Sequence, residues 1–141
     1  MEDCFHLGAK ALLWTSGKVL LLKRRNYWDI PGGRLERRES VLDGLHRELK
    51  EELGLKEVTG LFHVMLVLTN IRIPIQNGDV GLVLSVYQCE IPHFTPILSE
   101  EHDEFRWFIA EEAVEVLRDR YPPEFMLRIL GPSGRGPSES D

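Results

Sequence analysis

Residues 33–55 have the sequence GRLERRESVLDGLHRELKEELGL, and this stretch decides how the chain is organised. It predicts a helix over residues 40–53, because leucines recur there at the spacing of one buried helical stripe. Ser40 is the expected N-cap, with Asp43 three residues on in a variant of the capping box. Gly54 stands where a helix commonly ends in a left-handed residue. The predicted stripe consists of Leu42, Leu45, Leu49 and Leu53.

Three glutamates crowd one flank of this predicted helix. At about 100° per residue, Glu52 falls beside Leu45 at the edge of the apolar stripe. Glu48 and Glu51 lie within about one turn of it. Like charges at these spacings destabilise a helix by about 0.2–0.5 kcal/mol per pair, so stability alone does not account for them. Two interpretations stay open: a metal-binding cluster, or a solvated charged face eased by nearby basic residues.

Glycines lie next to this cluster. Gly44 stands one turn before Glu48 in mid-helix, where glycine is about 1 kcal/mol less stable than alanine. It either leaves space over the carboxylates for a ligand or serves packing. Pro31-Gly32-Gly33 is expected to end regular structure and to let the backbone pass close to another group. Carboxylates beside such a loop are typical ligands of Mg²⁺ or Mn²⁺, which usually bring substrate phosphates with them.

Outward from this region, apolar runs separated by turn residues predict a largely β remainder. Residues 7–14 and 18–25 are expected to form a hairpin around Thr15-Ser16-Gly17. Gln76-Asn77-Gly78-Asp79 is the expected turn between two later strands. The further predicted elements are strands at about 58–68, 80–91 and 104–109, a helix over about 110–118 and a short helix after Pro122-Pro123.

The composition is that of an ordinary globular domain. The chain has 141 residues, of which 43% are apolar and 28% are charged. These values exclude intrinsic disorder, a collagen repeat and a disulfide scaffold. The length predicts a single domain over residues 1–130, and the sequence GPSGRGPSESD predicts a disordered tail over residues 131–141. The net charge of −6 argues against a nucleic-acid polymer as partner.

Sequence features also bear on location. No apolar run approaches the ~20 residues of a membrane span, so no membrane partner is expected. The N-terminal sequence MEDCFHLG lacks the features of a signal peptide. Cys4 and Cys89 lack ligand spacing and fit either free thiols in a reducing cytoplasm or two small buried hydrophobes. The expected location is cytoplasmic, and the expected assembly is a monomer or a homodimer.

Residues 33–55 also resemble the Nudix box. The matching positions are Gly33, Glu39, Arg47, Glu48, Leu49, Glu51, Glu52, Gly54 and Leu55. The flanking residues 28–33, together with Glu101-His102 and Trp107, are similar to MutT-like Nudix hydrolases, so the resemblance covers about residues 5–118. It implies an α+β fold, an α/β/α sandwich in which a mixed sheet lies between helices and the box forms a loop–helix–loop.

The resemblance implies a set of metal ligands. Glu48 and Glu52 are the expected main ligands of Mg²⁺, for which Mn²⁺ can substitute. Glu51 is expected to support them, and the Gly32 carbonyl is a further candidate ligand. Glu101 holds the place from which a glutamate of MutT-like relatives reaches the metals, with solvated loop charge as the alternative. Glu48 is also the expected general base, with Glu101 as its rival.

Other positions are expected to shape the site. Arg47 and Glu39 should pair, either to orient the loop and the helix for catalysis or only to stabilise the fold. Gly33 and Gly54 are structural positions of the box. Glu104 lies in the same acidic stretch as Glu101. It is another candidate for the general base and an expected substrate contact.

Two arginines at the end of the second predicted strand, and three aromatic residues, are candidate substrate contacts. Arg24 or Arg25 is expected to meet phosphate through its planar fork of donors. Only one of them can face the site, because neighbouring strand residues alternate. Tyr27, Trp28 and Phe62 can stack on a base, although such aromatics are more often core residues.

The leading functional prediction is a Mg²⁺-dependent hydrolase that converts a nucleoside triphosphate to the monophosphate and pyrophosphate. Metal ions would neutralise the clustered phosphate charge and lower the pKa of the attacking water. The first alternative keeps the chemistry but takes ADP-ribose or another nucleotide sugar as substrate. The second is a catalytically silent nucleotide-binding sensor module. A purely structural metal site fits the glycine-rich loop poorly.

Overall fold

The computed structural model describes residues 1–131, which form seven strands and three helices. In chain order these are β1 (Phe5–Thr15), β2 (Lys18–Arg24), β3 (Tyr27–Asp29), β4 (Gly32–Arg34), α1 (Val41–Leu53), β5 (Phe62–Ile75), β6 (Gly78–Glu90), β7 (Glu104–Ile109), α2 (Ala110–Leu117) and α3 (Pro123–Leu130). The tail predicted over residues 131–141 falls almost wholly on residues 132–141, which lie outside the described part of the chain.

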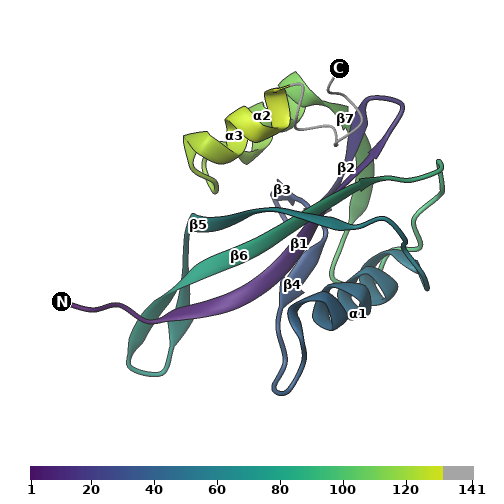
Figure 1. The fold of residues 1–141 in the computed structure, drawn as a ribbon. Coiled ribbons are helices and arrows are strands. Elements are labelled where there is room, and N and C mark those ends of the chain that lie inside the picture. Colours follow the sequence, from purple (N-terminus) through teal and green to yellow (C-terminus); the bar gives the residue numbers. More distant parts are fainter. Residues whose placement is uncertain (132–141) are drawn as a thin grey trace.

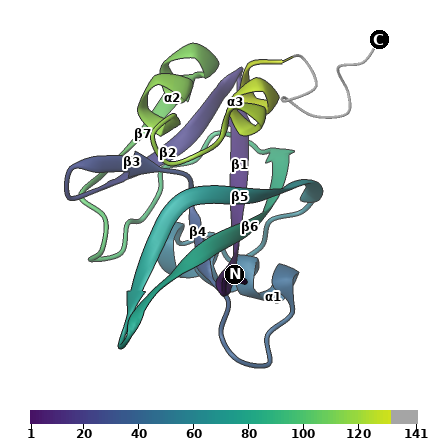
Figure 2. The same ribbon diagram turned by 90° about the vertical axis from the view of Figure 1, so that its left-hand side faces the viewer.

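All strands of the described residues join one mixed sheet, whose main path runs β3-β2-β1-β6-β5. Strands β1 and β6 are parallel, and the other strand pairs are antiparallel. Helix α1 lies on one side of the sheet, and α2 and α3 lie on the other (Figure 1; Figure 2). The predicted α+β fold with a mixed sheet between helices is confirmed.

The ends of helix α1 follow from the local sequence. The Ser40 side chain accepts a hydrogen bond of 3.1 Å from the Asp43 N–H, which satisfies one of the free donors of the first turn. Gly54 ends the helix with a left-handed φ of 75°, and its N–H reaches back to carbonyls of the last turn. These caps fix where the helix begins and ends. The position of the helix in turn decides which of its side chains face the sheet.

The first hydrophobic core lies between α1 and the sheet. Leu45, Leu49 and Leu53 are fully buried there, against side chains of β1 and β2. The prediction that Leu42 continues this stripe is wrong, since Leu42 is exposed. Val41, one turn before the first buried leucine, packs against the core in its place.

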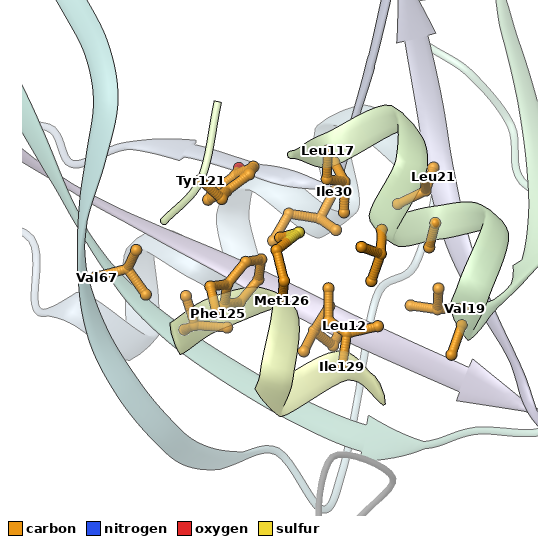
Figure 3. Close-up of a cluster of buried hydrophobic side chains, with 14 of the residues drawn as sticks. Leu12, Val19, Leu21, Ile30, Val67, Leu117, Tyr121, Phe125, Met126 and Ile129 are labelled. Atoms are coloured by element: carbon orange, nitrogen blue, oxygen red, sulfur yellow. The ribbon is translucent and has the colours of Figure 1, made fainter. Parts of the chain in front are cut away.

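The second core fills the opposite side of the sheet. Figure 3 shows Phe125, Met126 and Ile129 of α3 in one buried cluster with Leu12 of β1 and Leu21 of β2. This core anchors the segment that joins α2 to α3, and that segment borders the site described below.

The short strand β4 was not predicted from the sequence. The expectation that Pro31-Gly32-Gly33 ends regular structure is wrong at the glycines, because β4 pairs with β1. At Gly32, where φ is 132°, a side chain would overlap the backbone of Ala9 and Lys10. Glycine is therefore what lets the two strands approach.

The hairpin of β5 and β6 also differs from the prediction. Strand β5 begins at Phe62 rather than near residue 58 and continues past Pro74 to Ile75. It lies at the edge of the sheet, where proline is tolerated. The turn is correspondingly shorter than predicted, since Gly78 already belongs to β6.

No helix in residues 1–131 has the length and apolarity needed to cross a membrane.

Candidate active site

A cleft of about 670 Å³ is lined by strands β1 to β6, by α1 and by two loops that follow later in the chain. Its acidic lining residues include Glu48, Glu52 and Glu101. Its basic lining residues include Lys10, Arg24 and Arg120. The fold thus brings carboxylates of the helix together with a glutamate about fifty residues further along the chain. Opposite charges meet in one concave site.

Glu52 is the most deeply buried carboxylate of α1, with 7% of its surface exposed. Its Oε1 accepts a hydrogen bond of 2.8 Å from the Gly32 N–H, which fixes the helix against β4. Burial raises the pKa of Glu52 to about 7, and the charge of Lys10 only partly opposes this effect. The protein therefore holds a carboxylate whose charge is incompletely compensated.

Glu48 lines the same cleft as Glu52, and its carboxylate is likewise harder to ionise than a free one. Burial is the main reason that the pKa of Glu48 lies above its ordinary value, with Glu51 adding to the rise. A Cβ at position 33 would lie 2.6 Å from the Glu48 carboxyl carbon. Gly33 therefore provides the room that this carboxylate occupies.

The structure distinguishes between the two interpretations of Gly44, the glycine in the middle of α1. A side chain on Gly44 would overlap Leu35 and crowd the Glu39 carboxylate. The space above Gly44 is thus filled by the loop before the helix, and the packing interpretation is the correct one. The glycine that leaves space over a carboxylate is Gly33.

Arg47 ties that loop to the helix. Its Nε donates to Glu39 Oε2 at 2.6 Å, and its Nη2 donates to Glu39 Oε1 at 3.1 Å. The same guanidinium reaches Glu48 at 3.1 Å and Glu51 at 3.2 Å. Its hydrogen bonds lower the pKa of Glu39 and raise that of Arg47. The predicted pairing of Arg47 with Glu39 is present.

The other predicted acidic residues occupy different surroundings. The Glu51 side chain is exposed and contacts Arg47 rather than lining the cleft. Glu101 lines the cleft. Glu104 belongs to β7, pairs in register with Lys23 of β2 and is not among the cleft-lining residues of the described chain.

Arg24 and Arg25 separate as the alternation of a strand requires. Arg24 lines the cleft. Arg25 turns away with a left-handed φ of 59°, and its N–H donates to Asp103 at 3.0 Å. Trp28 packs edge-on against Phe108 with 5.1 Å between ring centroids.

Four residues that the sequence analysis did not select form a network beside the carboxylates. Buried Asp29 accepts hydrogen bonds from Lys10 at 3.2 Å, from Arg120 at 3.3 Å and from the Tyr121 hydroxyl. Burial opposes the ionisation of Asp29, but these partners hold the pKa of its carboxyl below the ordinary value. Lys10, a charged residue among the apolar residues of β1, could have indicated a buried ionic contact from the sequence alone. Its partners could not have been identified, because they are distant in the sequence.

His102 completes the surroundings of Glu52. Its Nε2 lies 3.8 Å from Glu52 Oε2, and its Nδ1 lies 3.4 Å from the Ser99 hydroxyl. Burial lowers the pKa of His102, and the positive charge of Lys10 adds to this effect. Burial thus disfavours a positive charge on the imidazole that lies next to Glu52.

The donor set suits a hard divalent cation. Glu48 and Glu52 are neighbouring carboxylates in one cleft, and burial raises the pKa of both. A cation between them would favour their ionised forms, and oxygen donors suit Mg²⁺ and Mn²⁺. Within residues 1–131, no group of three or more His, Cys, Asp or Glu side chains is already arranged as a metal cage.

Comparisons with known proteins agree with this geometry. The NUDIX domain family model matches residues 5–127. CTP pyrophosphohydrolase of Escherichia coli (strain K12) is 30% identical over 112 residues, which cover 74% of this chain and 76% of that enzyme. The MutT-like protein of Streptomyces ambofaciens is 27% identical over 136 residues, which cover 92% of this chain and 77% of that protein.

A solved structure shows the same fold. The crystal structure of the MutT protein from Methanosarcina mazei Go1 matches with a TM-score of 0.67 and 22% identity, over 92% of this chain and 95% of that one. The predicted MutT-like resemblance is confirmed. The predicted enzyme class, a pyrophosphohydrolase acting on phosphorus-containing acid anhydrides, is confirmed as well. The chain belongs to the Nudix family.

Proposed function

We propose that this chain hydrolyses nucleoside triphosphates to nucleoside monophosphates and pyrophosphate, with Mg²⁺ as its cofactor. The Nudix family generally uses a divalent metal such as Mg²⁺. The named activity of the CTP pyrophosphohydrolase relative supports a triphosphate substrate. A cleft of about 670 Å³ is of the size that small-molecule ligands occupy. The activity is assigned to one domain over residues 1–130, of which the family match spans 5–127.

The observation that carries the proposal is the pair formed by buried Glu52 and partly buried Glu48 in one cleft. Glu48 and Glu52 are both harder to ionise than free carboxylates because burial removes their water. Together with the Gly32 carbonyl and Glu101, they are the residues that would hold Mg²⁺, with Glu51 in a supporting role. When bound, Mg²⁺ supplies charge neutralisation for the phosphates and lowers the pKa of the attacking water.

The chain's own side chains supply the remaining chemistry. Arg24 lines the cleft and presents guanidinium donors to phosphate oxygens. A Glu48 carboxylate oxygen accepts the proton of the attacking water, and Glu101 is the alternative base in the same cleft. Arg47 keeps Glu48 in place through the hydrogen bond between them.

The test is a substrate panel with purified protein and Mg²⁺. The four common nucleoside triphosphates and ADP-ribose are incubated separately, and the products are separated by anion exchange. At least one triphosphate should yield its monophosphate and pyrophosphate. Turnover of ADP-ribose alone would contradict the proposed substrate class, and nucleotide binding without any turnover would contradict hydrolysis.

Variants connect the activity to the site. Glu52→Gln and Glu48→Gln are each expected to lower kcat by at least about 100-fold. Glu115→Gln is the matched control, because the Glu115 side chain is 68% exposed on α2 and contacts only Arg118 among the ion pairs of the described residues. An undiminished rate for Glu52→Gln would remove that residue from the site.

A further inference from the structure

The cleft has an apolar wall in addition to its charged residues. Ile71 and Ile73 of β5 and Leu82 and Leu84 of β6 line the same cleft as the carboxylates. Metal and phosphate chemistry does not use such a wall, whereas the flat face of a nucleobase does. Arg120 lines the cleft with them.

Arg120 is held in place from several directions. Its guanidinium carbon lies 4.1 Å from the centroid of the Tyr27 ring, and its Nη2 lies 3.3 Å from Asp29 Oδ2. Its carbonyl accepts a hydrogen bond of 3.0 Å from Asn70 N–H, which is next to Ile71 on β5. With 26% of its side chain exposed, the guanidinium is fixed but still accessible.

The carboxylate beneath it is already fully engaged. Asp29 Oδ1 accepts from the Ile30 N–H at 2.8 Å and from the Tyr121 hydroxyl. Its Oδ2 accepts from Lys10 and Arg120. Asp29 therefore positions the two cations and has no lone pair left for a ligand. Lys10 and Arg120 carry N–H donors only, so this part of the cleft favours hydrogen-bond acceptors.

We propose that Arg120, stacked on Tyr27 and held by Asp29, is a specificity-determining residue that donates to the acceptor edge of the substrate's base. A guanidinium binds two neighbouring acceptors best. Guanine offers O6 beside N7, and cytosine offers O2 beside N3, whereas adenine has no carbonyl oxygen. The site therefore prefers guanine or cytosine nucleotides to adenine nucleotides. This inference rests on the proposed nucleoside triphosphate substrate.

Binding measurements test the inference independently of hydrolysis. The probes are the α,β-methylene analogues of GTP, CTP, UTP and ATP, which cannot be cleaved between the α and β phosphorus atoms. Calorimetry with Mg²⁺ should show that the wild type binds the guanine or the cytosine analogue at least about tenfold more tightly than the adenine analogue. In Arg120→Ala the preference should shrink to within about threefold.

Two further variants complete the design. Arg118→Ala is the matched control, because Arg118 follows α2 two residues earlier, is 56% exposed and pairs with Glu115 at 3.1 Å; it should retain the wild-type preference. Arg120→Lys keeps a charge beside Asp29 and loses the planar fork, so it should lose the preference even if the alanine variant does not fold. Circular dichroism checks the fold of each variant.

The other outcomes overturn the inference. Equal weakening of all four analogues by Arg120→Ala would mean that Arg120 contacts phosphate. An unchanged preference would mean a purely structural role, and a wild type that binds all four alike, or none, would refute base selection. The proposed function is judged separately by the hydrolysis of cleavable triphosphates, so normal hydrolysis without base preference would overturn this inference alone.

Discussion

Replacing Glu52 with glutamine is expected to stabilise the metal-free protein at alkaline pH while removing its activity. The pKa of Glu52 is about 7 in the folded chain, against 4.5 for an ordinary glutamate. The folded state therefore binds this proton more tightly than the unfolded state does. Stability falls as the pH rises from 4.5 to 7, because ionisation is disfavoured only in the folded chain.

The size of the effect follows from the shift. One pKa unit corresponds to about 1.4 kcal/mol, so ionised Glu52 lowers the free energy of unfolding by about 3 kcal/mol at pH 8 and above. Glutamine has no charge to bury, and its amide oxygen can still accept the Gly32 N–H. Glu52→Gln should therefore exceed the wild type by up to about 3 kcal/mol at pH 8 in a chelating buffer. Below pH 4.5 the difference should disappear.

The assay is urea denaturation followed by tryptophan fluorescence, from pH 4 to pH 9, with and without Mg²⁺. Added Mg²⁺ should stabilise the wild type, by about 2.7 kcal/mol at 100 times its dissociation constant, and should stabilise the variant less. Glu115→Gln serves as the exposed control: it keeps Glu52, so its stability should follow that of the wild type at every pH. A variant that is no more stable than the wild type at pH 8 without metal would refute the argument from burial.

Two further substitutions test other parts of the site. Gly33→Ala should lower kcat/KM by at least about tenfold, because the added Cβ would lie 2.6 Å from the Glu48 carboxyl carbon; an unchanged kcat/KM in steady-state assays would show that this carboxylate can shift without loss. Asp29→Asn should lower the free energy of unfolding at pH 7 by about 3–5 kcal/mol, because Lys10 and Arg120 lose their charged partner. The partners lower the pKa of Asp29 in the folded chain. The stability that ionised Asp29 contributes is therefore present above pH 3.8 and is lost as the pH falls through its lowered pKa. Denaturation at pH 7 and pH 3 checks this, and an equal difference at both values would contradict it.

The sequence predicted those features that depend on neighbouring residues. Helix α1 has its own periodicity and its own caps at Ser40 and Gly54, so only its first leucine, Leu42, was misplaced. The angular position of Glu52 beside Leu45 correctly indicated a partly buried carboxylate. Strand β7 was predicted with its observed bounds because its turn and helix neighbours delimit it.

Features that depend on distant contacts could not be predicted in this way. Strand β4 is three residues long and exists because Gly32 lets it approach β1. Gly44 was predicted to leave space over the carboxylates or to serve packing, and only the path of the loop before α1 shows that it packs and that Gly33 provides the space. The Asp29 network joins residues up to 92 positions apart in the sequence, so no pattern of neighbouring residues predicts it.

Calorimetric titration of Mg²⁺, and of Mn²⁺ in parallel, measures whether Glu48 and Glu52 bind a divalent cation. We expect the metal-free wild type to take up either cation and Glu48→Gln and Glu52→Gln each to weaken uptake by at least about tenfold, whereas Glu115→Gln should bind as the wild type does. The absence of any uptake by the wild type, even with a nucleoside triphosphate present, would contradict the assignment of Glu48 and Glu52 as a metal site.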